Sequence, residues 1–144
     1  MKTNDVIDGI SIKLDGLFGD EYTIYTNNVK QELEMPCFFI KELPSSKQKL
    51  IGDRYENTNN LVIHTMLNDS EDITERLNDI ADKLYDLEYI TLVNGDMLKG
   101  FDMKTEISDN VLLFFVTYKY FTYKNKGNDT KMEELTVNGE VNNE

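Results

Sequence analysis

Cys37 and His64 are the residues with which this sequence could perform nucleophilic catalysis. A histidine that takes the proton of a nearby thiol activates it, so the two would form a hydrolase dyad if their strands were adjacent. Cys37, however, follows Pro36 at the start of an apolar segment, where a small buried hydrophobic residue is the simpler interpretation. His64 alternates with Val62 and Met66, as a structural histidine in a β-strand would. We therefore predict no catalytic residue and keep the Cys–His hydrolase as a weaker alternative.

The other polar residues do not form a recognisable metal or cofactor site. With one cysteine and one histidine, the chain lacks the donors of a zinc site. The carboxylates do not follow the alternation of a calcium loop, and no phosphate-binding glycine pattern is present. We expect neither a metal nor a cofactor. Asp79, Asp82 and Asp86 are interpreted as the exposed side of a helix.

The charge balance limits the class of partner. The 144 residues include 27 acidic and 15 basic side chains, and the formal net charge is -12. Such a chain is ill suited to bind nucleic acid or an anionic membrane, which both require a positive surface. The absence of an 18-residue apolar run predicts no membrane span, and the single cysteine indicates a reducing compartment. Partners are expected to be proteins.

A thirteen-residue apolar segment, VLLFFVTYKYFTY at residues 111–123, is the strongest structural signal. Its β-branched and aromatic residues predict a long central strand, with Tyr118 and Tyr120 covered and Thr117 and Lys119 facing solvent. Helical spacing of apolar residues predicts amphipathic helices over residues 4–18 and 71–87. Shorter strands are expected at residues 22–26, 37–43, 61–67, 89–93 and 98–107. This order predicts an α+β fold: a mainly antiparallel sheet with two helices packed on one face.

Residues 44–60, PSSKQKLIGDRYENTNN, form a connection too long for a simple hairpin turn. We interpret them as a protruding loop or hairpin arm that contacts another protein, because basic, apolar and aromatic residues occur together there, as they do in interfaces. A solubilising loop is the alternative. The predicted interface residues of this arm are Lys47, Lys49, Leu50, Ile51, Arg54 and Tyr55.

The sequence divides at about residue 124. Residues 1–124 are predicted to form a single α+β domain. Residues 125–144 are rich in Asn, Glu, Lys and Thr and have few apolar side chains. They are therefore predicted to be an acidic, disordered tail.

The ordered part resembles the tail terminator proteins of bacteriophages, also called tail completion or head–tail joining proteins. The resemblance covers roughly residues 3–123 and depends on the order and spacing of structural motifs. These motifs are Arg54-Tyr55, Ile63-His64, Leu87-Glu88-Tyr89-Ile90, Asp102-Met103 and Leu113-Phe114-Phe115. The chain departs from the family pattern at residues 59–62, where the family tends to have an aromatic and an acidic residue.

This resemblance implies a structural, non-enzymatic subunit of a contractile-tailed phage, a prophage or a phage-tail-like bacteriocin. It implies a ring, expected to be a hexamer, that caps the tail tube, ends polymerisation and receives the head connector. In such a ring we expect the basic arm of one subunit to meet the acidic helix face of the next, so Asp79, Asp82 and Asp86 are also predicted interface residues. The implied partners are further copies of the chain, the tube protein, the sheath protein and the connector, which assemble in the bacterial cytoplasm before joining the virion. The alternative from another class is an acidic inhibitor or immunity-type protein that binds a basic partner.

Overall fold

The computed structural model describes residues 2–26 and 33–124. This part of the chain contains two α-helices, α1 (Thr3–Phe18) and α2 (Ile73–Leu84), and a 3₁₀ helix, η1 (Tyr85–Glu88), which continues α2. The strands are β1 (Thr23–Tyr25), β2 (Cys37–Glu42), β3 (Ser46–Lys49), β4 (Arg54–Met66), β5 (Tyr89–Thr91), β6 (Met97–Ser108) and β7 (Val111–Tyr123). The predicted α+β fold is confirmed.

Two compact units divide the chain. The larger unit comprises Met1–Ser46 and Thr58–Tyr120, and the smaller one comprises Lys47–Asn57 and Phe121–Glu144. Strands β4 and β7 each pass from one unit into the other. A single domain over residues 1–124 stays a prediction, and the predicted disordered tail at 125–144 lies outside the described residues.

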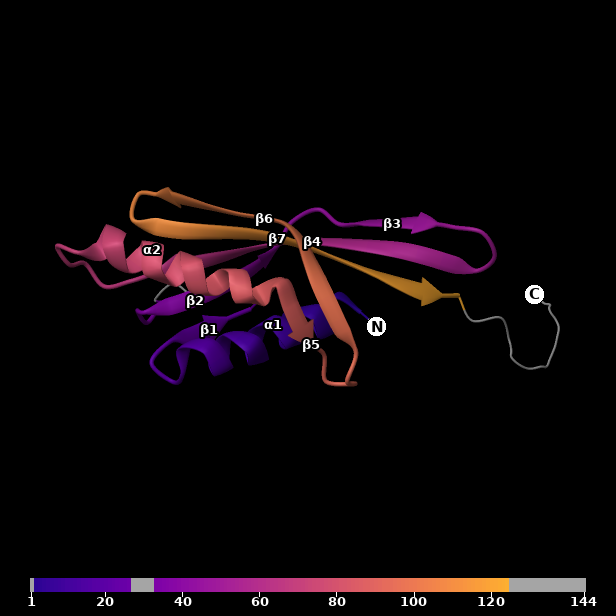
Figure 1. The fold of residues 1–144 in the computed structure, drawn as a ribbon, viewed down its shortest axis with the longest axis horizontal. Coiled ribbons are helices and arrows are strands. Elements are labelled where there is room, and N and C mark those ends of the chain that lie inside the picture. Colours follow the sequence, from indigo (N-terminus) through magenta and orange to yellow (C-terminus); the bar gives the residue numbers. More distant parts are fainter. Residues whose placement is uncertain (1, 27–32, 125–144) are drawn as a thin grey trace. The chain divides into compact units, whose positions relative to one another are not determined.

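The strands form a mostly antiparallel sheet in the order β1-β2-β4-β7-β6-β5, with β3 paired to β4 (Figure 1). The β2–β4, β5–β6 and β6–β7 pairs are antiparallel, whereas β1 pairs with β2 in parallel. The turn between β6 and β7 is made by Asp109 and Asn110, both with positive φ. Asp and Asn tolerate this conformation better than most residues, which explains why they occupy a tight hairpin turn.

The core of the larger unit lies between the two helices and one face of the sheet. This arrangement follows from the patterning, because the apolar side of each helix and every second strand residue must leave water together. Among its buried members are Ile7, Ile10 and Leu14 of α1, Leu77 and Leu84 of α2, and Phe38, Ile63, Phe114 and Tyr118 of the sheet.

The start of β4 and the exposure of Thr117 were predicted wrongly. β4 begins at Arg54, seven residues before the apolar segment from which the strand was predicted. Its polar start is held by side-chain hydrogen bonds, such as the one from Asn57 Nδ2 to Thr122 Oγ1 at 2.9 Å. Thr117, predicted to face solvent, is buried because its hydroxyl donates to Asn60 Oδ1 at 2.7 Å.

Candidate assembly surfaces

The structure places Cys37 and His64 on neighbouring strands but not opposite one another. Cys37 pairs with Met66, and His64 pairs with Phe39, whose ring centroid lies 5.8 Å from that of the imidazole. Burial raises the pKa of the Cys37 thiol, which disfavours the reactive thiolate. Burial, and then the charge of Lys41, lower the pKa of His64. Within the described chain, no hydrogen bond joins the two side chains.

Neither a metal site nor a membrane span emerges from the described residues. Histidine, cysteine, aspartate and glutamate side chains do not gather there in groups of three or more that could hold a metal ion. No helix in the same part of the chain is both long and apolar enough to cross a bilayer.

The predicted arm is a β-hairpin, which we call the basic hairpin (residues 47–57, in the smaller unit). The Leu50 amide donates to the Arg54 carbonyl at 2.7 Å and closes its turn. Gly52 adopts a φ of 77° in this turn, a conformation that glycine takes without strain. The strand extension is therefore shown, whereas protrusion of the hairpin stays a prediction.

Two cations of the basic hairpin contact aromatic rings. The Lys47 ammonium lies 5.0 Å from the centre of the Tyr55 ring, and the Arg54 guanidinium lies 4.1 Å from that of Phe121. Both are cation–π distances, and such contacts limit the freedom of long side chains. The structure thus brings together all six predicted arm residues. Sequence analysis missed Phe121, because only the pairing of β4 with β7 identifies it as a neighbour of Arg54.

Ile51 lies at the tip of this hairpin, and 98% of its surface is exposed. Lys49, Leu50 and Arg54 surround it. An isoleucine in water forgoes about 1.5–3 kcal/mol of burial free energy. An apolar tip among cations is therefore suited to a contact with an apolar, acidic surface.

The predicted acidic residues form an acidic stripe on the larger unit: Asp79 and Asp82 on α2 and Asp86 on η1, all exposed. Their spacing of three and four residues places them on one side of the helix. A hollow of about 240 Å³ beside Asp79 is lined by Phe18, Tyr22 and Ile80, among others, and by the basic Lys83. The three carboxylates thus lie along one side of the helix, but the basic Lys83 lies close to them.

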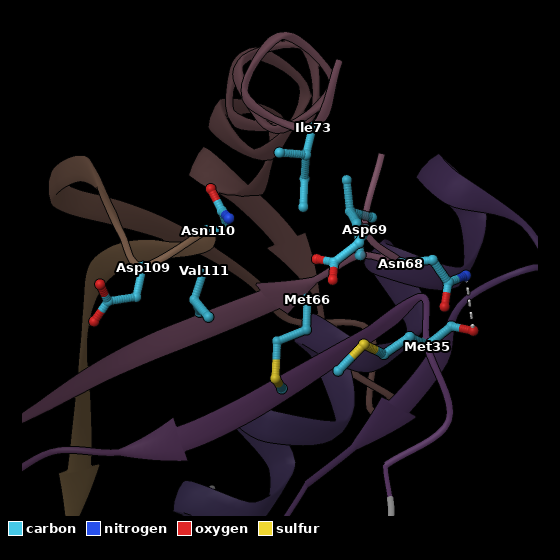
Figure 2. Close-up of a pocket in the computed structure, with 9 residues that line it drawn as sticks. Met35, Met66, Asn68, Asp69, Ile73, Asp109, Asn110 and Val111 are labelled. Carbon is cyan, nitrogen blue, oxygen red and sulfur yellow. Dashed lines mark hydrogen bonds between the residues drawn. The ribbon is translucent and has the colours of Figure 1, made fainter. Parts of the chain in front are cut away.

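A pocket that sequence analysis missed lies in the larger unit, and we call it the Met66 pocket (Figure 2). It has a volume of about 380 Å³ and lies where β4 ends, α2 begins and the β6–β7 turn closes. The lining residues are Met35, Met66, Leu67, Asn68, Asp69, Ile73, Asp109, Asn110 and Val111. The sequence identified several of them as turn or strand residues. Their proximity depends on β4 lying beside β7, which no local pattern indicates.

Lysines also contact aromatic rings on the sheet face turned away from the core. Lys99 and Lys119 lie 5.7 and 5.8 Å from the centre of the Phe101 ring, and Lys104 lies 5.0 Å from that of Phe115. These side chains are on strands β6 and β7 of the larger unit. Cationic and aromatic side chains therefore also meet outside the basic hairpin, on this face of the sheet.

Comparison with known families places these surfaces in context. Residues 5–130 match a family described as phage tail terminator protein. This range includes the basic hairpin, the acidic stripe and the Met66 pocket. A search among curated proteins found no match. The match confirms the resemblance that the motifs of the sequence indicated.

Proposed function

The chain belongs to the family of phage tail terminator proteins, and on this premise we propose that it forms a ring that caps the tail tube. A structural role in a phage tail follows from the family itself. We further propose that the ring is a hexamer, that it ends polymerisation of tube and sheath, and that it presents the attachment surface for the head connector. Assembly would take place in the host cytoplasm, in a contractile tail or a tail-like bacteriocin.

The observation that carries the proposal is the presence of two unlike, oppositely charged surfaces on one chain. A ring requires a heterologous contact, in which one patch of a subunit meets a different patch of the next. The basic hairpin and the acidic stripe meet this requirement. Copies with a net charge of -12 would otherwise repel each other, and a contact made through the cations of the basic hairpin would offset part of that repulsion.

We also propose that the protein works without catalysis. A thiol whose pKa is raised by burial is a poor nucleophile, and among the described residues no hydrogen bond from Cys37 to His64 is present to activate it. Rapid reaction of Cys37 with a thiol reagent at neutral pH, in the folded protein, would contradict this part of the proposal.

Tube polymerisation tests the proposed function directly. Purified protein added to polymerising tube protein should shorten the tubes and add ring-shaped density at one end in negative-stain images. Tubes that grow to the same length with unmodified ends would contradict it. An inhibitor or immunity protein would leave the tubes unaffected and bind a basic partner instead.

Charge reversal tests the heterologous contact. The variant Lys47→Glu/Lys49→Glu/Arg54→Glu should weaken the ring, because it replaces attraction to the acidic stripe by repulsion. Light scattering of the free protein and occupancy on tube ends both measure the effect. Lys99→Glu/Lys104→Glu/Lys119→Glu is the matched control, since it changes the net charge equally on another surface. An unchanged mass and unchanged occupancy in the hairpin variant would contradict the contact.

A further inference from the structure

We propose that Ile51 of one copy inserts into the Met66 pocket of the next copy in the ring. Lys49 and Arg54 would then lie beside Asp69 and Asp109 at the pocket edge. The inference rests on the proposed ring and deepens it, because it names both sides of the contact. The partner is a second copy of this chain.

The side chain proposed to insert, Ile51, is apolar, and its transfer from water into an apolar pocket is favourable. Ile51 is 98% exposed, with Leu50 next to it at the closed turn of the basic hairpin. The cations beside it are on opposite strands of the hairpin, Lys49 at the end of β3 and Arg54 at the start of β4. A partner must therefore offer an apolar cavity with negative charge on two sides.

The Met66 pocket has these properties. Met66, Ile73 and Val111 supply apolar walls from β4, α2 and β7. Figure 2 shows Asp69 and Asp109 on different sides of it, one after β4 and the other in the β6–β7 turn. Both residues are exposed, and the volume of about 380 Å³ is within the range of sites that accept a ligand group.

Charge distinguishes this pocket from the hollow beside α2. That smaller hollow of about 240 Å³ is also lined by two carboxylates, Glu21 and Asp79, but Lys83 lines it as well and would repel Lys49 and Arg54. The described residues that line the Met66 pocket include two carboxylates and no basic side chain. Complementary charge therefore favours the Met66 pocket as the site for the hairpin tip.

The acidic stripe can take part in the same contact. Ile73 lines the pocket and Asp79 lies six residues further along α2, a rise of about 9 Å. Lys47 precedes Ile51 by four residues, a separation of at most about 13 Å in an extended chain. A hairpin laid along α2 with its tip in the pocket would bring Lys47 near Asp79. The pocket thus adds an apolar anchor to the charge pairing of the proposed ring.

Cross-linking between two populations of the chain tests the contact. One population carries Ile51→Cys and the other Val111→Cys, and each retains the buried Cys37. Under mild oxidation, the mixture should form a disulfide-linked dimer roughly tenfold faster than a mixture of Ile51→Cys with Thr91→Cys. Thr91 is an exposed control that pairs with Met97, at the opposite end of β6 from the turn. Equal rates, or no dimer in either mixture, would overturn the inference.

Charge rescue provides a second test. Asp69→Lys alone should weaken association by roughly tenfold, and Lys49→Glu/Arg54→Glu should weaken it further. Combining all three substitutions in one chain should recover association by roughly tenfold relative to the hairpin variant. Asp69 is preferred to Asp109 for the reversal because the positive φ of Asp109 favours Asp or Asn. If the combined variant loses as much association as the sum of the two separate losses, the proposed charge pairing is wrong.

Ile51→Asp separates failure of this inference from failure of the proposed function. If wild-type protein caps tubes and Ile51→Asp caps them equally well, the pocket contact is wrong and the capping ring stands. If wild-type protein does not cap tubes, the proposed function fails whatever the cross-linking shows. The inference expects Ile51→Asp to fold normally and to lose tube-end occupancy by roughly tenfold.

Discussion

Two phenylalanines of strand β7 illustrate the difference between the two units. Phe114, in the larger unit, is fully buried and meets Tyr85 edge-on at a centroid distance of 5.4 Å. Phe121, in the smaller unit, remains 46% exposed and carries the Arg54 guanidinium on its ring. The same residue type thus packs in the core of one unit and contacts a cation in the other, and in the proposed ring this cation belongs to the subunit contact. Burial predicts stability effects, whereas exposure beside charge predicts effects on assembly.

Removing each ring tests this contrast most strongly. Phe114→Ala should lower the free energy of unfolding by about 3–5 kcal/mol, because it leaves a cavity in the core. Phe121→Ala should lower it by no more than about 1 kcal/mol, since it removes a half-exposed ring and a cation–π contact. Urea unfolding followed by circular dichroism measures both. Equal losses would show that the smaller unit contributes to stability as the core does.

The tyrosines of β7 sharpen the contrast with a smaller change. The Tyr118 hydroxyl donates to the Leu87 carbonyl at 2.6 Å, and burial raises the pKa of Tyr118 so that it stays protonated. Tyr118→Phe leaves that carbonyl without this donor and should lower the free energy of unfolding by about 1–3 kcal/mol. Tyr123→Phe, at a position that is 74% exposed, is the control and should have no measurable effect. Similar values for both variants would contradict the importance of the buried hydrogen bond.

Hydrophobic patterning was sufficient to predict the elements that build the core. The predicted strand at 111–123 coincides with β7, and the predicted helix at 4–18 differs from α1 by one residue at its start. Tyr118 and Tyr120 are buried, as their alternation with Lys119 predicted. These features were predictable because burial repeats with the period of the element that carries it.

Features that depend on tertiary contacts were not predictable. The polar start of β4 is ordered by partners distant in sequence, as in the hydrogen bond from Asn59 to Thr3 at 3.3 Å. The strand β3 has only exposed polar residues and therefore shows no hydrophobic period. The Met66 pocket exists because the end of β4 and the start of β7 meet the start of α2. In each case the sequence shows the residue types but not their neighbours.

Hydrogen exchange can test whether the basic hairpin opens independently of the larger unit, although the expected effect is smaller. Tyr55→Leu keeps apolar bulk but removes the ring under Lys47, a contact worth about 0.5–1 kcal/mol. Hydrogen exchange of the Leu50 amide, which donates to Arg54, should therefore speed up about two- to fivefold. The Leu92 amide, which donates to Asp96 at 2.7 Å in the larger unit, is the internal control. Equal acceleration at both amides would indicate that the two units open together.

The smallest expected effect concerns pH and the only histidine of the chain. Burial, and secondarily the charge of Lys41, lower the pKa of His64 in the folded protein below the ordinary value of 6.5. As the pH falls below that value, the unfolded chain binds the proton before the folded one does, so stability declines toward the lowered folded pKa. His64→Gln should remove this part of the decline. Urea midpoints at pH 7.5 and about 5.5 should therefore differ more for the wild type than for the variant. Because the histidine belongs to the larger unit, equal pH dependence in both proteins would mean that this contribution to core stability is absent.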